Sequence, residues 1–215
     1  MRWQASLLLL VLLVSAAGQQ ESHGQRGQGR GQGRGQGRGM ARMLEEPGRA
    51  AWQKPDEVVA ALKIRDSEII ADIGAGTGYF TRRFAARAGK VYAVDVNSSL
   101  LEQIQALGLP NVVPVPAAPD DPKLPQGGVD TIFFCNVLHH IENRPAYYAK
   151  LRAALRPGGR VVVIDFHKRP LPVGPPPDEK LAEEEVIAEF QKSGFRLDRK
   201  HDWLEHQYFL EFRPR

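Results

Sequence analysis

The stretch Ile69-Ile70-Ala71-Asp72-Ile73-Gly74-Ala75-Gly76-Thr77-Gly78-Tyr79-Phe80 is an apolar run that leads into three glycines and then into a helix start. Such a run, followed by such a loop, is typical of a buried strand, a tight turn and a helix. Because glycine lacks Cβ, a ligand can approach the backbone, and the first N–H groups of the helix can donate to it. The next apolar run, Val91–Asp95, ends in a carboxylate that can accept hydrogen bonds from both hydroxyls of a ribose. These features together predict a site for a nucleoside-containing cofactor.

Strand-like and helix-like segments alternate on both sides of this stretch, which favours a doubly wound α/β domain with a mostly parallel sheet. The predicted strands are Glu68–Ile73, Val91–Asp95, Val112–Val115, Thr131–Cys135 and Arg160–Phe166. The predicted helices are Pro55–Leu62, Tyr79–Ala86, Leu100–Leu107, Pro145–Leu155 and Glu179–Gln191. Two late stretches, Phe195–Asp202 and Gln207–Phe212, have no helix between them and predict a closing antiparallel hairpin.

Residues 1–18 have the pattern of a secretory signal peptide: Arg2, an apolar run over Leu7–Val14 and then small residues. The run is shorter than the ~20 apolar residues that span a bilayer. The alternatives are an uncleaved anchor and a misassigned start of the chain. We therefore expect an exported or periplasmic protein if the leader is a working signal, and a cytoplasmic or membrane-tethered protein otherwise. Membrane contact is expected only through an uncleaved leader.

Residues 19–40 contain an Arg-Gly-Gln-Gly repeat over Arg26–Gly39, and nine of the 21 glycines of the chain precede residue 41. This composition predicts a disordered tail. The tail is either a soluble tether or a weak, salt-sensitive contact for a polyanion, because its guanidinium groups have no aromatic stacking partners.

The domain predicted over residues 41–215 has no net charge, because the 29 basic and 25 acidic residues of the chain leave 24 of each sign after residue 40. The basic character of the chain lies in its tail, which argues against nucleic acid as a partner of the domain. The chain has one cysteine, Cys135. A single thiol excludes an intramolecular disulfide framework and a cysteine-rich zinc site, and we expect no metal.

Asp72 followed by Gly74, Gly76 and Gly78 resembles the first motif of the class I S-adenosylmethionine (SAM)-dependent methyltransferases. The resemblance extends from about Trp52 to the C-terminus and includes the turn at Leu155–Gly159 and the closing hairpin. The segment 136–141 and the short length look most like the small-molecule branch that includes the quinone-ring methyltransferases. The resemblance implies a Rossmann-like, mostly parallel seven-stranded sheet, with SAM as cofactor and S-adenosylhomocysteine as product.

Roles for individual residues follow from this resemblance. The three glycines form the methionine and ribose loop, Asp72 faces the methionine ammonium, Asp95 binds the ribose and Val96 lies by the adenine. Asp120 is the candidate partner of the adenine amino group. The alternatives at this last position are backbone contacts around Ala118, or a plain turn without a ligand role.

Methyl transfer is an in-line displacement, so the enzyme chiefly aligns the acceptor, and a hydroxyl, amine or ring-carbon acceptor also needs a base. Residues after the fourth and fifth strands face the acceptor in this architecture. They are Asn136, which we group with the cofactor-binding residues, and His139, His140 and His167, which are the candidate catalytic bases. The alternatives are a helix cap for Asn136, turn positions for His139 and His140, and an exposed loop position for His167.

Two segments are expected to cover the acceptor. The first is 43–63, with Trp52, Gln53 and Lys54, and the second is the proline-rich loop 167–177. They form either a lid, or a core anchor and an extended surface connection.

The sequence thus predicts an enzyme (EC 2.1.1.-) that transfers a methyl group from SAM to a small, apolar or aromatic acceptor. The alternative is a non-catalytic binding module that keeps the cofactor fold and engages a polyanion through its tail. A nicotinamide-dependent oxidoreductase is disfavoured by the glycine spacing. The sequence does not define the oligomeric state.

Overall fold

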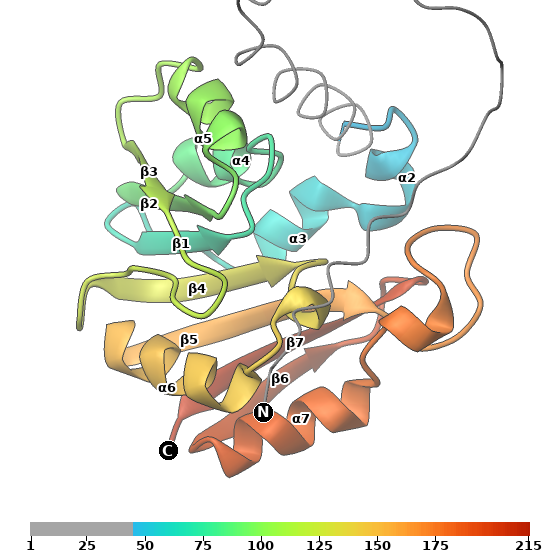
Figure 1. The fold of residues 1–215 in the computed structure, drawn as a ribbon. Helices are drawn as coiled ribbons and strands as arrows, with labels where there is room; N and C mark the ends of the chain where they lie inside the picture. The colour runs from blue at the N-terminus through green and yellow to red at the C-terminus, as the bar shows by residue number, and fades with distance from the viewer. Residues whose placement is uncertain (1–44) are drawn as a thin grey trace, which may run out of the picture.

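The computed structural model describes residues 45–215 (Figure 1). The expectations for the leader and the Arg/Gly tail lie outside the described residues. The strands are β1 Ile69–Ile73, β2 Lys90–Asp95, β3 Val112–Pro116, β4 Val129–Cys135, β5 Leu155–Phe166, β6 Phe195–His201 and β7 Gln207–Pro214. The α-helices are α2 Arg49–Gln53, α3 Pro55–Ala61, α4 Thr81–Ala85, α5 Ser98–Gln105, α6 Arg144–Ala154 and α7 Glu183–Lys192. Two 3₁₀ turns are η1 Leu138–His140 and η2 Pro177–Glu179.

The seven strands form one sheet in the order β3-β2-β1-β4-β5-β7-β6. Strands β1 to β5 are mutually parallel, whereas β7 runs antiparallel to both β5 and β6. The predicted fold, including the closing hairpin, is confirmed. The strand order reverses direction between β1 and β4, which is where open α/β sheets of this kind bind ligands.

Some boundaries differ from the predicted ones. Helix α7 begins at Glu183, after the predicted start at Glu179, because the prolines lead into the separate turn η2. Helix α4 is shorter than predicted and begins at Thr81, because Gly78 has a positive φ and the chain turns through Tyr79 and Phe80. Helix α2 was not expected as a separate helix, and it ends at Gln53 because the following residue, Lys54, adopts a left-handed conformation.

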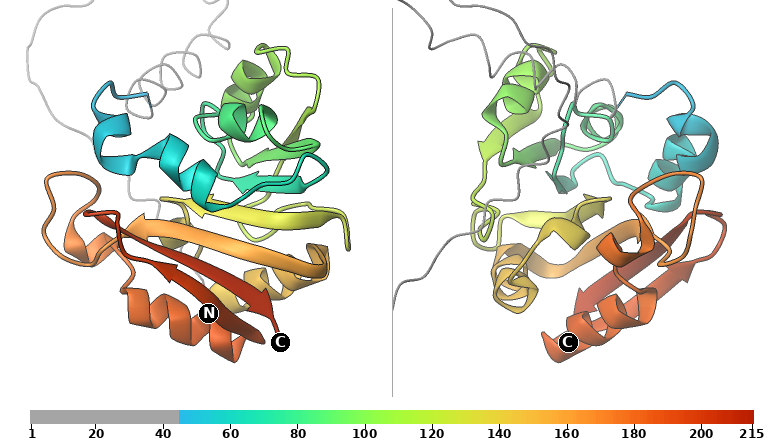
Figure 2. Two further views of the ribbon diagram at one scale, coloured as in Figure 1. Left: turned by 180° about the vertical axis from the view of Figure 1, so that it is seen from behind. Right: turned by 45° about the vertical axis from the view of Figure 1, so that its right-hand side comes forward.

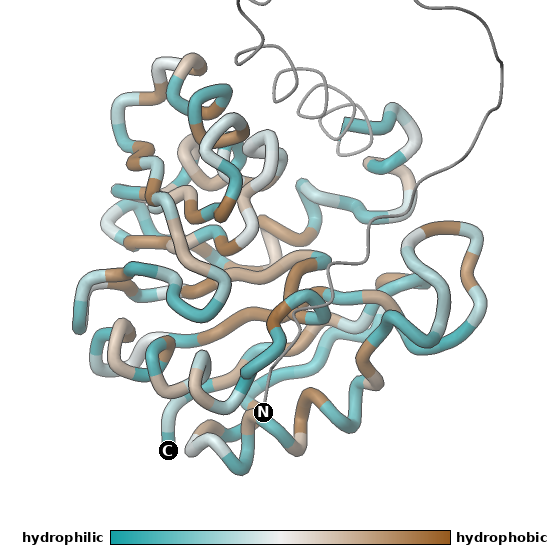
Figure 3. The backbone as a smooth tube through the Cα atoms, in the orientation of Figure 1, coloured by the Kyte–Doolittle hydropathy of each residue, from teal (hydrophilic) through white to brown (hydrophobic). Residues whose placement is uncertain are grey.

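The sheet is buried between two helical layers (Figure 2). Ile70 on β1 packs in a cluster with α3 and α4, whereas its neighbour Ala71 packs in a cluster with α6 and α7. This alternation follows from the two-residue period of a strand and explains why the central strands are apolar on both faces. The edge strand β6 is polar by contrast, with exposed residues such as Arg199 and Lys200 (Figure 3). A charged edge discourages further strand pairing.

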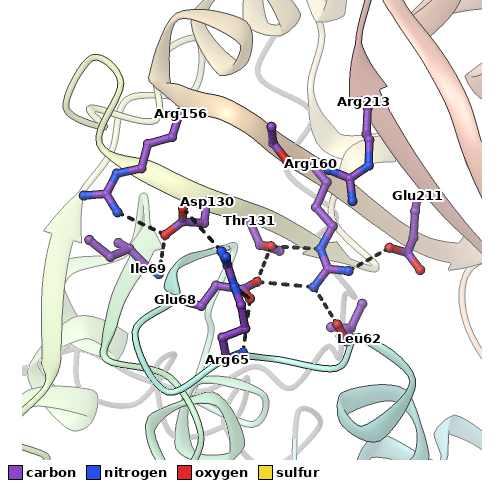
Figure 4. A network of polar contacts seen from close by, with 11 residues as sticks. Leu62, Arg65, Glu68, Ile69, Asp130, Thr131, Arg156, Arg160, Glu211 and Arg213 are labelled. Atoms are coloured by element: carbon purple, nitrogen blue, oxygen red, sulfur yellow. Dashed lines mark hydrogen bonds and ion pairs between the residues drawn. The ribbon is translucent and has the colours of Figure 1, made fainter.

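A network of buried charges joins the amino ends of the central strands (Figure 4). Arg160 on β5 binds Glu211 on β7 at 2.9 Å and donates to Thr131 on β4 at 3.0 Å. Thr131 in turn donates to Glu68, just before β1, at 2.7 Å. The Arg160 guanidinium also donates to the carbonyl of Leu62 at 2.6 Å. The network therefore joins β1, β4, β5 and β7 at the side of the sheet where the parallel strands begin, opposite the side that carries the predicted cofactor loop.

Candidate functional site

The parallel strands β1, β2, β4 and β5 all end at one edge of the sheet, and the segments that follow β1, β4 and β5 line one cavity of about 650 Å³. The lining residues come from α2 and its preceding turn, the glycine loop, the turn after β4 and the loop after β5: Glu46, Arg49, Trp52, Asp72, Gly74, Ala75, Gly76, Thr77, Tyr79, Phe80, Cys135, Asn136, Val137, His139, His140, Phe166, Pro172, Val173, Gly174 and Pro175. The cavity thus brings together Asp72, Gly74, Gly76, Asn136, His139 and His140, whereas the predicted site residues Gly78, Asp95, Val96, Asp120 and His167 do not line it.

The loop after β1 depends on glycine for its shape. Gly74, Gly76 and Gly78 have φ values of +68°, +58° and +86°. A Cβ on Gly74 would lie 2.3 Å from a methyl carbon of Val137, so the loop packs directly against the turn that follows β4. The N–H of Gly74 donates to the carbonyl of Val94 at 2.8 Å, which fixes the loop beside the end of β2. The loop is therefore a close-packed backbone surface on the wall of the cavity.

Asp95 ends β2 and is held in place by backbone donors. Its two carboxylate oxygens accept from the N–H groups of Gly76 and Asn97, each at 2.8 Å. The side chain thus links the glycine loop to the start of α5, where Asn97 caps the helix through Ser99. Each carboxylate oxygen can accept more than one hydrogen bond, so the group keeps acceptor capacity for hydroxyls.

Asp72 is 3% exposed and lies on the cavity wall. Its carboxylate accepts from the hydroxyl of Thr81 at 2.6 Å. Burial, helped by the nearby charge of Asp95, raises the pKa of Asp72 from 3.8 to about 7, against the lowering effects of the Thr81 hydrogen bond and of the Arg49 guanidinium. A buried carboxyl whose charge is under-compensated favours a cationic ligand.

A chain of buried and half-buried side chains runs along one wall of the cavity. The guanidinium of Arg49 donates to the side-chain oxygen of Gln53, whose amide donates to Gln207 at 3.1 Å and to the sulfur of Cys135 at 3.0 Å. Gln207 then donates to the side-chain oxygen of Asn136. Asn136 has a φ of +59° and lies between β4 and η1, so it fixes this turn and does not cap a helix. Burial raises the pKa of Cys135 to about 12, so its thiol stays protonated at neutral pH.

The three candidate histidines occupy different places. His139 lines the cavity, and its Nδ1 lies 2.9 Å from both carboxylate oxygens of Asp165. His140 also lines the cavity but is exposed, and its ring centroid lies 4.1 Å from that of His139. Burial and the charge of His139 lower the pKa of His140. His167 lies outside the cavity and lines a separate hollow next to Arg169. The structure therefore brings His139 and His140 to the cofactor loop and leaves His167 apart.

The two residues predicted to lie by the adenine are at the surface. Val96 follows Asp95 and is 64% exposed, which is unusual for a large apolar side chain. The side chain of Asp120 is 78% exposed and stands 3.9 Å from Lys150, at the tip of a turn closed by hydrogen bonds between Ala118 and Asp121. This turn corresponds to the plain-turn alternative in its shape, and the role of Asp120 stays a prediction.

The expected covering segments both reach the cavity. Trp52 on α2 packs against Phe166 with ring centroids 5.7 Å apart. Gly174 in the proline-rich loop lies over the same ring, because a Cβ added there would meet Phe166 at 2.7 Å. Just before α2, Glu45 joins the first covering segment to the glycine loop, because its carboxylate accepts from the hydroxyl of Thr77 at 2.6 Å. The far wall of the cavity is therefore aromatic and apolar.

No group of His, Cys, Asp and Glu side chains among residues 45–215 is arranged to hold a metal ion. No helix formed by those residues has the length and apolar character needed to cross a bilayer.

Comparison with known proteins gives consistent matches. A family model described as a methyltransferase domain matches residues 71–161. The ubiquinone/menaquinone biosynthesis C-methyltransferase UbiE of Burkholderia vietnamiensis is 32% identical over 116 residues, which are 51% of this chain and 48% of UbiE. The chain thus matches about half the length of this curated relative. A SAM-dependent methyltransferase from Aquifex aeolicus superposes with a TM-score of 0.75 at 24% identity, over 80% of this chain and 95% of the other. The complex of DhpI with S-adenosylhomocysteine superposes with a TM-score of 0.66 at 19% identity, over 84% and 94% of the two chains.

The fold is that of the class I SAM-dependent methyltransferases. Residues 71–161 match a methyltransferase domain, and this part of the chain is similar to quinone C-methyltransferases. The resemblance predicted from the glycine motif is therefore confirmed.

Three polar residues of the site were not predicted. Asp165 lies within an apolar strand, and an isolated acid near the end of such a strand is a signal that could have found it. Thr81 and Gln207 carry no comparable signal, because their importance arises only from contacts with Asp72 and Asn136 across the fold. Arg49 lies in the predicted covering segment 43–63, but no role was predicted for it.

Proposed function

We propose that this protein transfers a methyl group from SAM to a small, apolar or aromatic acceptor, and that a quinone-like ring is the first acceptor class to test. The observation that carries the proposal is the meeting of two surfaces in one cavity. A glycine loop with Asp72 forms one side, and an aromatic wall with His139 forms the other. The UbiE relatives support the acceptor class, because their names describe methyl transfer to carbon in quinone biosynthesis.

The residues of the loop fit SAM in charge and shape. The buried carboxyl of Asp72 suits the methionine ammonium, because a positive charge relieves the cost of ionising a buried acid. The carboxylate of Asp95, already oriented by Gly76 and Asn97, has acceptor capacity for the ribose hydroxyls. Val96 offers an exposed apolar surface to the adenine. When bound, SAM supplies a methyl group on a positively charged sulfur, and the protein has to align the acceptor with it and exclude water.

The covering segments suit the acceptor side of the cavity. Trp52 and Phe166 give an apolar wall of two rings tilted by 37°, and the prolines of the loop 167–177 limit the movement of that loop. An aromatic acceptor can pack against such rings in an offset or tilted arrangement. The guanidinium of Arg49, buried 4.0 Å from the centroid of Tyr79, adds positive charge to this side of the cavity. These contacts favour an aromatic ring that carries an acidic hydroxyl.

Calorimetric titration of the full chain with SAM, S-adenosylhomocysteine and NADH in parallel tests the cofactor. We expect saturable one-site binding of the two adenosyl ligands and none of NADH. Incubation with SAM labelled in its methyl group and a reduced naphthoquinone then tests the acceptor class. Binding without transfer to any of a panel of phenols and hydroquinones would favour the non-catalytic module. No adenosyl binding by the folded protein would reject the proposal.

A further inference from the structure

Asp165 is a buried acid that the cofactor site itself does not use. It is the second-to-last residue of β5. Positions 161–166 of this strand are all buried, and Asp165 is the only charged residue among them. Its side chain is 2% exposed. The N–H of Phe166 donates to one carboxylate oxygen at 2.9 Å, so the group has a fixed orientation. A buried carboxylate in such a strand is costly unless it is hydrogen-bonded, and this one has two partners.

The second partner is His139. Both oxygens of Asp165 lie 2.9 Å from Nδ1 of His139, whose side chain is 6% exposed. Because an ionised carboxylate only accepts, Nδ1 must carry the proton. In the neutral ring Nε2 then holds the lone pair, and no residue among 45–215 makes a hydrogen bond to Nε2. Since His139 also lines the cavity, the basic nitrogen is the one left for a ligand.

Other titratable and charged groups surround the pair on every side. They are His140 on η1, Glu179 in η2, Lys180 after η2 and Tyr208 on β7, together with Arg49, Asp72 and Cys135 around the cavity. Lys180 is 2% exposed, donates to the carbonyl of Arg169 at 2.9 Å and interacts electrostatically with Asp165. Burial raises the pKa of Tyr208, so its hydroxyl stays neutral beside Asp165. The Asp165 carboxylate is thus the negative group in direct contact with His139.

We infer that Asp165 is the positioning residue for His139, and that the pair selects acceptors that lose a proton from oxygen or carbon when they are methylated. This inference rests on the proposed methyl transfer and names the residue that accepts the proton. The new bond joins the acceptor to the methyl carbon while the methyl–sulfur bond breaks, and its electron pair stays on sulfur. The acceptor proton passes to Nε2 of His139. The positive charge that leaves the sulfur thus appears on the imidazole, next to the carboxylate of Asp165.

A second His–acid pair in this molecule provides a matched control. Nε2 of His201 lies 2.8 Å from Glu211, and both side chains are nearly as buried as those of His139 and Asp165. His201 is on the outer strand β6 and does not line the cavity. A purely structural role predicts that the two pairs behave alike when ligands bind. A role in proton transfer predicts that only His139 responds.

The first test is ¹⁵N NMR of the histidine ring nitrogens in the full chain, with and without saturating S-adenosylhomocysteine. We expect the Nδ1–H form for His139 and a change of its ring signals with ligand, while the signals of His201 stay unchanged. In Asp165→Asn, the ring signals of His139 should shift, because a neutral amide replaces the charged acceptor at Nδ1. An Nε2–H form of His139, or ring signals indifferent to the ligand, would overturn the inference.

The second test is kinetic and uses a reduced naphthoquinone as acceptor. Asp165→Asn should lower kcat about 10–100-fold, leave the Kd for SAM within about twofold, and move the acidic limb of the kcat profile to lower pH. Asp165→Glu should restore part of the rate. An unchanged kcat and pH profile in Asp165→Asn would overturn the inference, and if no acceptor is turned over, the NMR result decides. Failure of the wild-type chain to bind SAM would instead reject the proposed function together with this inference.

Discussion

The two edges of the parallel sheet carry buried acids in opposite electrostatic settings. At the amino edge, Glu68 and Glu211 are both bound by the guanidinium of Arg160, at 3.3 and 2.9 Å. At the carboxyl edge, Asp72 is hydrogen-bonded to an uncharged hydroxyl, and burial raises its pKa to about 7. Both edges are hollow, with cavities of about 470 and 650 Å³. The two edges therefore differ more in how the charges of their buried acids are compensated than in the burial of those acids or in cavity size.

This difference has a physical meaning. Acids paired with arginine stabilise the arrangement of the strands and have no demand for a further cation. At Asp72 the effect of burial outweighs the opposing effect of the Arg49 guanidinium, so its ionised form costs free energy until a ligand supplies more positive charge. The amino edge is accordingly a structural device, and the carboxyl edge is prepared for a cationic ligand.

The largest expected effect is at the amino edge. Arg160→Ala removes the cation that Glu68 and Glu211 share, and leaving buried charges unpaired costs about 3–5 kcal/mol. Urea unfolding measures this loss. Arg156→Ala is the matched control, because Arg156 is 41% exposed and its contact with Asp130 is expected to contribute less than about 1 kcal/mol. Equal losses in the two variants would show that the Arg160 network is not the structural device described above.

The second effect is on the ligand. Asp95→Ala should weaken SAM binding by about 2–4 kcal/mol, because charge-assisted hydrogen bonds to the ribose are lost and the loop loses its anchor at Gly76. Calorimetry measures the change. Asp95→Asn keeps one acceptor for a backbone N–H and should lose less. Unchanged affinity in Asp95→Ala would remove Asp95 from the cofactor site.

The sequence was sufficient to predict the framework of this site and not its polar detail. The loop around Gly74 could be predicted because local glycine chemistry and an adjacent apolar strand create it. The pair of His139 and Asp165 could not, because the two residues lie on different segments and meet only when β4 and β5 pair. His167 follows β5 as directly as predicted, yet the loop after Phe166 carries it into a separate hollow. Strand order fixes which edge a residue reaches, but loop paths decide which cavity it enters.

The third effect concerns Asp72 and pH. Because the pKa of Asp72 is higher in the folded chain than in the unfolded chain, the folded protein loses stability as the pH rises from about 4 to about 7. For a pKa raised from 3.8 to about 7, the full cost is up to roughly 4 kcal/mol and is present above pH 7. Asp72→Asn should therefore stabilise the ligand-free protein by about 1–3 kcal/mol at pH 8 and have little effect at pH 4. Thermal unfolding at the two pH values measures this difference.

The same ionisation should govern the ligand. SAM affinity of the wild-type chain should fall by up to about tenfold per pH unit below pH 7, since the ammonium needs an ionised Asp72. Asp72→Asn should bind SAM weakly at every pH. If Asp72→Asn is less stable than the wild-type chain and its SAM affinity still depends on pH, the contrast between the two edges is contradicted.

The smallest expected effect lies at the outer end of the carboxyl edge, where the predicted adenine contacts are exposed. Val96→Ala removes two methyl groups, which limits the loss of SAM affinity to about 1.5 kcal/mol, and the stability should not change because the side chain is 64% exposed without ligand. Asp120→Ala distinguishes the two explanations of its turn. A loss of SAM affinity similar to that of Val96→Ala would support contact with the adenine amino group, whereas unchanged affinity would leave Asp120 as a turn residue beside Lys150. Because both side chains are exposed, calorimetry of the two variants reports on ligand contact with little contribution from folding.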